Sequence, residues 1–185
     1  ALDWFRAETK AAGFPDLHLN QVYWNVGILP GEQALSDPNE TLTALGFDSI
    51  TSYVWVHHVP LNTFPETEYR SVFGEYMKFW ERTETEISLP YYPNASMGWD
   101  SSPRTVQSDI FRSVGYPFTN CLGNNTPENF QQALQVIKQR MDRGEGPKIL
   151  TINAWNEWTE GSYLEPDTVH GMGYLEAIRN VFNQG

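Results

Sequence analysis

Glu157 and Glu160 form a pair of acidic side chains with a spacing that could support chemistry. They lie three positions apart in the segment NAWNEWTEG (residues 153–161), with Trp155 before the pair and Trp158 inside it. Cleavage of a glycosidic bond needs two carboxyl groups, one that donates a proton and one that acts as base or nucleophile. The segment therefore predicts a catalytic pair in a sugar site. Solvated glutamates in an ordinary strand-to-helix loop fit the spacing equally well.

Aromatic, amide and charged residues also follow the other expected strands. In parallel α/β folds, functional side chains gather where strands end and loops begin. Sugar rings stack their apolar faces on aromatic side chains, while their hydroxyl groups need polar partners. The candidates for substrate binding are therefore Trp24, Trp99, Asp100, Arg104, Trp155, Asn156, Trp158 and Glu165.

Each of these candidates has a structural alternative. Asp100 and Arg104 could pair with each other to fix a long loop, although a role at this edge is favoured. One tryptophan beside the acids could belong to the core. Glu165, which precedes Pro166, could equally well stabilise its loop.

The hydrophobic pattern predicts helices that alternate with strands. An amphipathic helix opens the chain and stops at Gly13, and a short helical stretch ends near Gly46. Longer helices are expected near 66–82, 127–143 and 171–183, the second with Thr126 as its N-cap. Strands rich in β-branched and aromatic residues are expected at 17–24, 49–56, 87–93 and 148–155.

This alternation predicts an α/β fold of four parallel strands joined by crossover helices. Residues 1–185 contain no internal repeat and no linker, so they form a single unit. Four parallel strands make either a small open sheet or half of an eight-stranded TIM barrel, which needs about 250 residues. The residues at the strand ends favour the half barrel. Tyr53 and Trp55 have the same parity on one strand, and a core position is favoured for both.

The amino-acid composition limits the kinds of molecule that the protein can be expected to bind. The net charge of −11, with only 12 lysines and arginines and no basic run, argues against nucleic acid. No apolar run approaches the roughly 18 residues of a membrane span. The single cysteine, Cys121, excludes an intramolecular disulfide, and the four histidines show no metal-ligand spacing. We therefore expect a carbohydrate partner, no membrane, no metal and no cofactor.

Three segments resemble a known family. AWNEWTEGSYLEPD (residues 154–167), followed by HGMGYLEAIRNVF, resembles the C-terminal signature of glycoside hydrolase family 99 and its WbsX-type relatives. SLPYYPNASMGWDSSPR (88–104) is similar to the WbsX-type segment in which a Trp-Asp pair precedes an arginine. LGFDSITSYVW (45–55) fits the preceding strand of that group. The resemblance covers essentially the whole sequence, but only the second half of the family's domain.

The resemblance implies the C-terminal half of a (β/α)₈ barrel that acts on α-linked, mannoside-like glycans with retention of configuration. Glu157 would deprotonate the 2-hydroxyl group of the sugar, and Glu160 would act as general acid and then base. A glycosyltransferase-like protein of polysaccharide biosynthesis, or a non-catalytic carbohydrate-binding fragment, is the alternative. Because open strand edges need partners, we expect a homodimer or pairing with an N-terminal half-barrel. An extracellular or periplasmic location is preferred to the cytoplasm.

Overall fold

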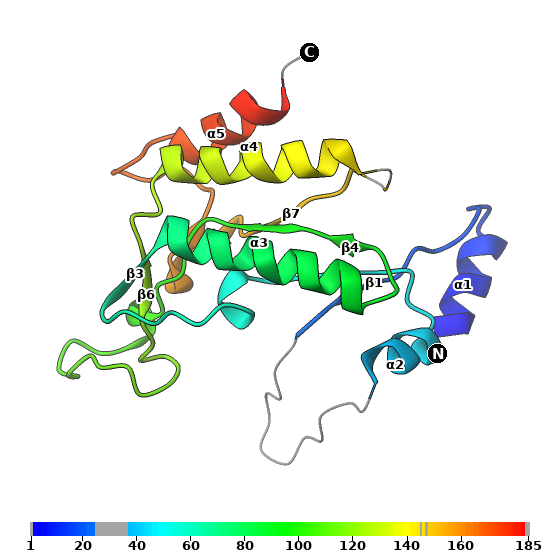
Figure 1. Ribbon diagram of the computed structural model, residues 1–185, viewed down its shortest axis with the longest axis horizontal. Helices are drawn as coiled ribbons and strands as arrows, with labels where there is room; N and C mark the ends of the chain where they lie inside the picture. Colours follow the sequence, from blue (N-terminus) through cyan, green and yellow to red (C-terminus); the bar gives the residue numbers. More distant parts are fainter. Residues whose placement is uncertain (1, 25–36, 145, 147, 184–185) are drawn as a thin grey trace.

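The computed structural model describes residues 2–24, 37–144, 146 and 148–183 (Figure 1). Its helices are α1 (Leu2–Ala11), α2 (Pro38–Leu45), α3 (Tyr69–Glu86), α4 (Pro127–Arg143) and α5 (Gly173–Phe182). Its strands are β1 (Asn20–Val22), β2 (Ser49–Thr51), β3 (Glu66–Glu68), β4 (Tyr91–Tyr92), β5 (Asn94–Ser96), β6 (Cys121–Gly123), β7 (Thr151–Asn153), β8 (Asn156–Glu157) and β9 (Ser162–Tyr163). Three 3₁₀ turns complete it: η1 (Trp55–His57), η2 (Ser102–Arg104) and η3 (Trp158–Glu160).

The strands that follow the helices are parallel. β1, β2 and β4 form one sheet in that order, and β5 pairs with β7. Only Pro93 separates β4 from β5, and its carbonyl oxygen accepts a hydrogen bond from the Thr151 N–H at 3.0 Å. A separate parallel pair joins β3 to β6, and β8 and β9 form an antiparallel hairpin. The predicted α/β class with parallel strands is confirmed; the sheets are small, and the half barrel remains a prediction.

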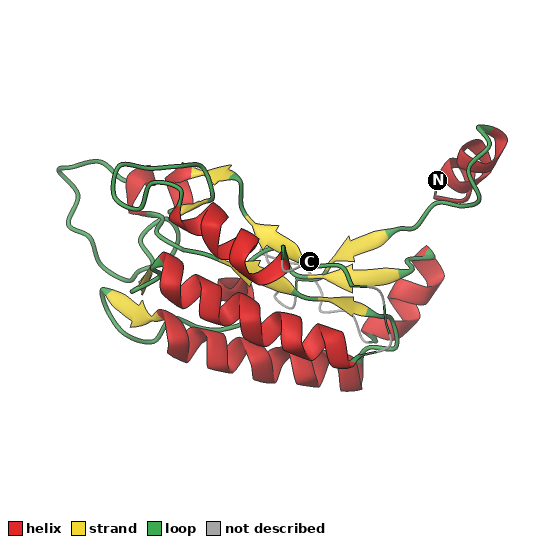
Figure 2. Cartoon of the chain, turned by 90° about the horizontal axis from the view of Figure 1, so that it is seen from above, coloured by secondary structure: helices red, strands yellow, loops and turns green. Residues whose placement is uncertain are grey.

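The two faces of these strands differ in chemistry. Ile50 and Ala95 are fully buried and belong to the core formed with α3 and α4, which lie along one side of the strands (Figure 2). Neighbouring positions on a strand point to the opposite face. On that face Thr51 donates a hydrogen bond to the Tyr92 carbonyl oxygen at 2.8 Å and shares another with Thr151 at 3.0 Å. Helices thus cover the apolar face, and a polar face lies on the other side.

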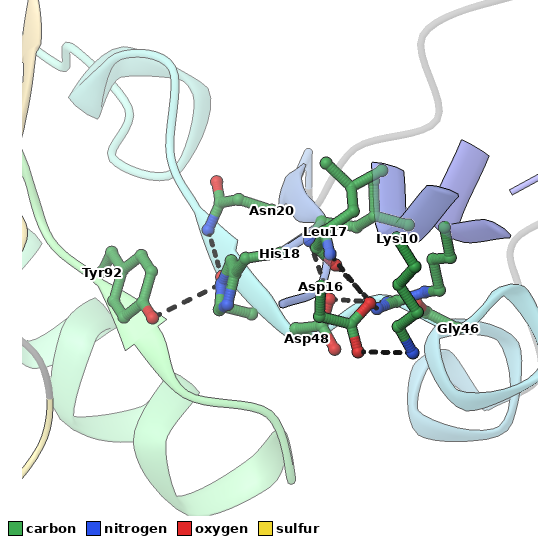
Figure 3. Close-up of polar contacts among 11 residues, drawn as sticks. Lys10, Asp16, Leu17, His18, Asn20, Gly46, Asp48 and Tyr92 are labelled. Carbon is green, nitrogen blue, oxygen red and sulfur yellow. Dashed lines mark hydrogen bonds and ion pairs between the residues drawn. The ribbon is translucent and has the colours of Figure 1, made fainter. Parts of the chain in front are cut away.

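Helix α1 stands apart from this body (Figure 2). None of its residues is buried, and Trp4 and Phe5 are exposed. Its attachment is polar: the Arg6 guanidinium donates to the Gly46 carbonyl oxygen at 2.8 Å and to the Asp48 carboxylate at 2.6 Å. Figure 3 shows Gly46 and Asp48 in one polar cluster with Lys10, Asp16 and Leu17. The helix is therefore held mainly by charged hydrogen bonds and not by packing.

The helices follow their sequence signals closely. Helix α4 occupies the expected residues, and the Thr126 hydroxyl accepts a hydrogen bond from the Asn129 N–H at 3.4 Å. Helix α3 begins at Tyr69 instead of Glu66, because residues 66–68 form β3 and pair with β6. Strand β6 lies in a stretch for which no strand was expected.

Within the described ranges, no helix is both long and apolar enough to cross a bilayer.

The strands are shorter than predicted. The expected strand over 49–56 ends at Thr51, and the chain turns into η1 at Trp55. The shared parity of Tyr53 and Trp55 is therefore lost. Trp55 is fully buried, as expected, but Tyr53 is 37% exposed, so its core prediction is wrong.

Candidate active site

The two candidate catalytic glutamates lie just beyond the carboxyl end of β7. The chain continues from β7 into the β8–β9 hairpin, in which Glu157 lies opposite Ser162. The Ser162 hydroxyl contacts both the carbonyl and the side-chain oxygen of Asn153, at 2.9 and 2.6 Å. Gly161 ends η3 in the left-handed region at φ 60°, a conformation that favours glycine. These contacts fix the hairpin that carries the acids against the end of β7.

Arg104 joins the two carboxylates. Its Nη2 lies 2.9 Å from Glu157 Oε1 and 3.3 Å from Glu160 Oε1. The two oxygens can therefore be no farther apart than the sum of these distances, about 6.2 Å. Glu160 is only 8% exposed, whereas Glu157 is partly open to solvent and accepts a hydrogen bond from the Thr159 hydroxyl at 2.8 Å. The structure thus brings three of the predicted charged residues, Arg104, Glu157 and Glu160, into contact.

A backbone contact positions Glu160. The Asp100 N–H donates to the Glu160 carbonyl oxygen at 2.6 Å. A Cβ atom at Gly98 would lie 2.0 Å from the Gly161 carbonyl oxygen, and one at Gly161 would lie 2.9 Å from the Asp100 Cβ. Only glycine permits this approach at either position without a shift of the backbone. The loop after β5 and the turn that carries Glu160 are therefore packed backbone to backbone.

Asp100 and Arg104 do not take the alternative arrangement in which they would pair with each other. Arg104 pairs with the glutamates, while Asp100 Oδ1 accepts hydrogen bonds from the Ser102 N–H at 2.9 Å and from Cys121 Sγ at 3.2 Å. Burial, together with the Asp100 carboxylate, raises the pKa of Cys121 to about 12, so its thiol stays protonated near neutral pH. Asp100 thus shapes the loop that delivers Arg104 to the acids.

Tyr116 is a residue of the site that sequence reasoning missed. Its hydroxyl donates to Glu160 Oε1 at 3.3 Å, and its ring lies 5.7 Å from the Arg104 guanidinium carbon and 6.4 Å from the Trp99 ring. Partial burial and the Glu160 charge raise the pKa of Tyr116, so its hydroxyl remains a donor. The irregular stretch that carries Tyr116 shows no hydrophobic periodicity. The only available signal was an aromatic residue in a loop beyond a strand.

An aromatic cavity of about 670 Å³ adjoins Glu160. Within it the Trp24 ring lies 4.1 Å from His57 and 6.2 Å from Tyr53. Burial lowers the pKa of His57, which keeps its ring neutral near pH 7, and burial with the nearby glutamate charges raises the pKa of Tyr53. Its aromatic and acidic lining includes Trp24, Tyr53, His57, Trp99, Tyr116 and Glu160. Two predicted binding residues, Trp24 and Trp99, therefore share one wall with a candidate catalytic acid.

The remaining predicted binding residues lie on the hairpin side of the acids and do not line this cavity. Trp155, Asn156 and Trp158 are exposed, so neither tryptophan belongs to the core. The Trp158 ring stacks on Tyr163 with centroids 3.7 Å apart, and its Nε1 donates to Glu165 Oε2 at 2.6 Å. Glu165 thus fixes an exposed aromatic platform. In the part of the chain described, no three His, Cys, Asp or Glu side chains gather as they would around a metal ion.

An acid pair, an arginine and an aromatic cavity lie at the carboxyl ends of parallel strands, where α/β proteins place their ligand sites, and two carboxyl groups beside aromatic rings suit a carbohydrate ligand. Comparison with known proteins agrees. Residues 1–178 match the family described as Glycosyltransferase WbsX, and the chain belongs to this family. The expected WbsX-type resemblance is therefore confirmed. Family membership indicates a carbohydrate-active protein connected with polysaccharides; it does not distinguish a hydrolase from a transferase.

Two curated relatives are similar over part of the chain. Both carry the description "Uncharacterized protein WxcX" and come from two strains of Xanthomonas campestris pv. campestris. Each is 30% identical over 96 residues, which are 50% of this chain and 12% of the relative. The chain therefore matches only a small part of much longer proteins.

Proposed function

We propose that this chain carries the acid pair of a carbohydrate-active enzyme that acts on glycosidic bonds with net retention of configuration. The observation that carries the proposal is the shared contact of Glu157 and Glu160 with Arg104 Nη2. Carboxyl groups in retaining glycosidases lie about 5–5.5 Å apart, and those in inverting enzymes lie about 6.5–9.5 Å apart to admit a water molecule. At most about 6.2 Å separates the two contacting oxygens, so both acids can reach one sugar unit. Retention by this pair would use the sugar's own 2-hydroxyl group, not a covalently attached carboxylate.

The environments of the two acids suggest different roles. Glu160 lines the aromatic cavity and contacts the Tyr116 hydroxyl, so it is placed to exchange a proton with a leaving group held there. Glu157 lies outside the cavity and closer to solvent, where it would deprotonate the sugar's 2-hydroxyl group. Trp24 and Trp99 would stack on the substrate, and the Trp158 platform would contact it on the other side of the acids. The substrate class we propose is α-linked, mannoside-like glycans.

A glycosyltransferase of polysaccharide biosynthesis is the second candidate. The description of the family as a glycosyltransferase favours it. Both reactions break the bond between the anomeric carbon and a leaving oxygen, and both can use the same acids. They differ in whether water or a sugar hydroxyl group receives the glycosyl unit.

Turnover of 4-nitrophenyl α-mannoside by the wild type and by Glu157→Gln and Glu160→Gln tests the proposal. We expect each substitution to abolish release of nitrophenol, and proton NMR to show an α-anomer as the first product. Glu75→Gln is the matched control, because Glu75 is exposed on α3, pairs with Lys78 and does not line the cavity. A free sugar identifies a hydrolase, and a product formed only with an added acceptor sugar identifies a transferase. A β-anomer would refute retention, and binding without turnover by the wild type would indicate a non-catalytic carbohydrate-binding unit.

We also propose that residues 1–185 form one half-barrel unit. The parallel arrangement in chain order supports this, as does the edge position of β1 and β7 among the described strands. Unpaired edges favour association with another set of strands, either a second copy or an N-terminal half-barrel. Light scattering on a sizing column tests the first: a mass of two chains supports a homodimer, and a stable monomer of ordinary solubility would oppose it.

A further inference from the structure

The candidate site is chemically asymmetric about Glu160. On one side lie the charged and hydroxyl groups of Glu157, Arg104 and Thr159. On the other side the cavity wall adds the aliphatic side chains of Val56 and Leu61 to its aromatic rings. A ligand that contacts Glu160 can therefore have a polar part on one side and an apolar part on the other.

Several polar groups in the cavity wall are already engaged within the protein. Asn120 Nδ2 donates to the Leu61 carbonyl oxygen at 2.5 Å, whereas Asn120 Oδ1 and His57 Nδ1 are buried without a hydrogen-bond partner in the protein. The Thr119 hydroxyl accepts from Trp99 Nε1 at 3.1 Å. A ligand hydroxyl group held against the aliphatic side chains of Val56 and Leu61 would lose its water partners and gain none from these two residues, which is unfavourable. An apolar group has no such requirement.

The loop between η2 and β6 lines part of the cavity and also carries exposed aliphatic side chains. Ser113, Gly115 and Tyr116 of this loop line the cavity. In the same loop Val106 is 63% exposed, Ile110 is 73% exposed and Val114 is 71% exposed. Exposed aliphatic residues that gather beside a cavity commonly mark a binding surface. We call the apolar lining of the cavity beside Glu160 and these three exposed residues of the adjoining loop the apolar path.

We propose that this path binds an apolar chain attached to the sugar through the bond on which the acid pair acts, so that the substrate is a glycolipid-type glycoside. The inference rests on the proposed function of Glu157 and Glu160. In the hydrolytic case Glu157 takes the proton of the 2-hydroxyl group and the 2-oxygen bonds to C1, while the bond between C1 and the leaving oxygen breaks and Glu160 protonates that oxygen, which departs as an apolar alcohol. Water then bonds to C1 and gives a proton to Glu160, while the bond from C1 to the 2-oxygen breaks and Glu157 returns its proton to that oxygen.

The test is the affinity of the wild-type protein for methyl, butyl and octyl α-mannosides, measured by calorimetry below the micelle concentration of each. Burial of one methylene contributes about 0.8 kcal/mol, so each methylene that enters the cavity should raise the affinity about fourfold. We expect affinity to rise from methyl to butyl to octyl. Leu61→Asn in the cavity and Val114→Asp on the exposed loop should each reduce this gain. Val136→Asn, on the exposed face of α4, is the control.

Equal affinities for the three mannosides would overturn the proposal. If the affinities are equal and Ile110→Asp also halves the solution mass, the exposed loop is a contact between two copies of the chain instead of a ligand site. The outcome is separable from that of the proposed chemistry. A chain-length response that persists in Glu160→Gln, in a protein that never turns over any mannoside, supports the apolar site and refutes the catalytic role.

Discussion

His58 should make the fold sensitive to acid. Both of its ring nitrogens are buried without hydrogen-bond partners, and its ring stacks on Phe79 with centroids 3.9 Å apart. Burial, with a smaller contribution from the charge of His57, lowers the pKa of His58 to about 4, against about 6.5 in an unfolded chain. The unfolded chain therefore binds a proton at His58 more tightly than the folded chain does. The stability that the neutral ring contributes is complete above about pH 6.5 and is lost as the pH falls towards 4.

The size of this effect follows from the shift. A pKa difference of about 2.5 units corresponds to about 3.4 kcal/mol when the pH is well below both values, and to about 2 kcal/mol at pH 5.0. Urea unfolding at pH 7.5 and 5.0, followed by tryptophan fluorescence, measures it. His58→Phe keeps a ring against Phe79 and removes the titrating group, so the wild type should lose about 2 kcal/mol more than this variant.

Comparison of the two proteins cancels the carboxylates that titrate in both. The same loss of unfolding free energy in the wild type and in His58→Phe would refute the reasoning. It would mean that the His58 ring reaches solvent, or finds an acceptor for its proton, without unfolding of the chain.

Three further predictions concern packing, attachment and the site. Gly98→Ala should lower the free energy of unfolding in urea by several kcal/mol, because its Cβ would lie 2.0 Å from a backbone oxygen. Gly74→Ala, at a position on α3 with open space around it, should raise this free energy by up to about 1 kcal/mol. Arg6→Ala should speed amide exchange in α1 alone, and protection of α1 equal to that of the wild type would contradict its polar attachment. Tyr116→Phe should lower kcat about tenfold with KM little changed, through loss of the hydrogen bond to Glu160; an unchanged kcat would exclude a role for the hydroxyl.

Elements whose signals lie within one segment could be predicted from the sequence. Thr126 and Pro127 start α4, and Gly144 follows it, because a cap and a stop act on neighbouring backbone groups. The strand bounds could not be predicted equally well. Tyr53 and Trp55 keep strand-like residue types, but the chain leaves the strand after Thr51. The Trp55 ring is buried, and its Nε1 donates to the Asn94 carbonyl oxygen at 2.8 Å, a tertiary contact that no local pattern encodes.

The candidate site also combines residues that are close in the sequence with residues that only the tertiary structure brings together. Glu157 and Glu160 are three residues apart, so their association is visible in the sequence. Arg104 is 53 residues from Glu157, and Tyr116 is 44 residues from Glu160. Arg104 was recognised because it follows an expected strand, and strand position decides which loops meet at one edge. Tyr116 lies farther along the chain after the same expected strand, in an irregular stretch, and no local pattern indicates that this stretch returns to Glu160.

The positions of Gly98 and Gly161 indicate how the charged cluster is built. The Arg104 contacts alone would leave the acids poorly fixed, because long side chains at partly exposed positions hold one geometry weakly. The hydrogen bond from the Asp100 N–H to the Glu160 carbonyl oxygen joins two backbone groups, so it fixes the turn independently of any side-chain contact. That bond requires the two segments to approach as closely as the glycines allow. The placement of Glu160 is thus set by backbone packing, and Arg104 then selects the orientation of its carboxylate relative to that of Glu157.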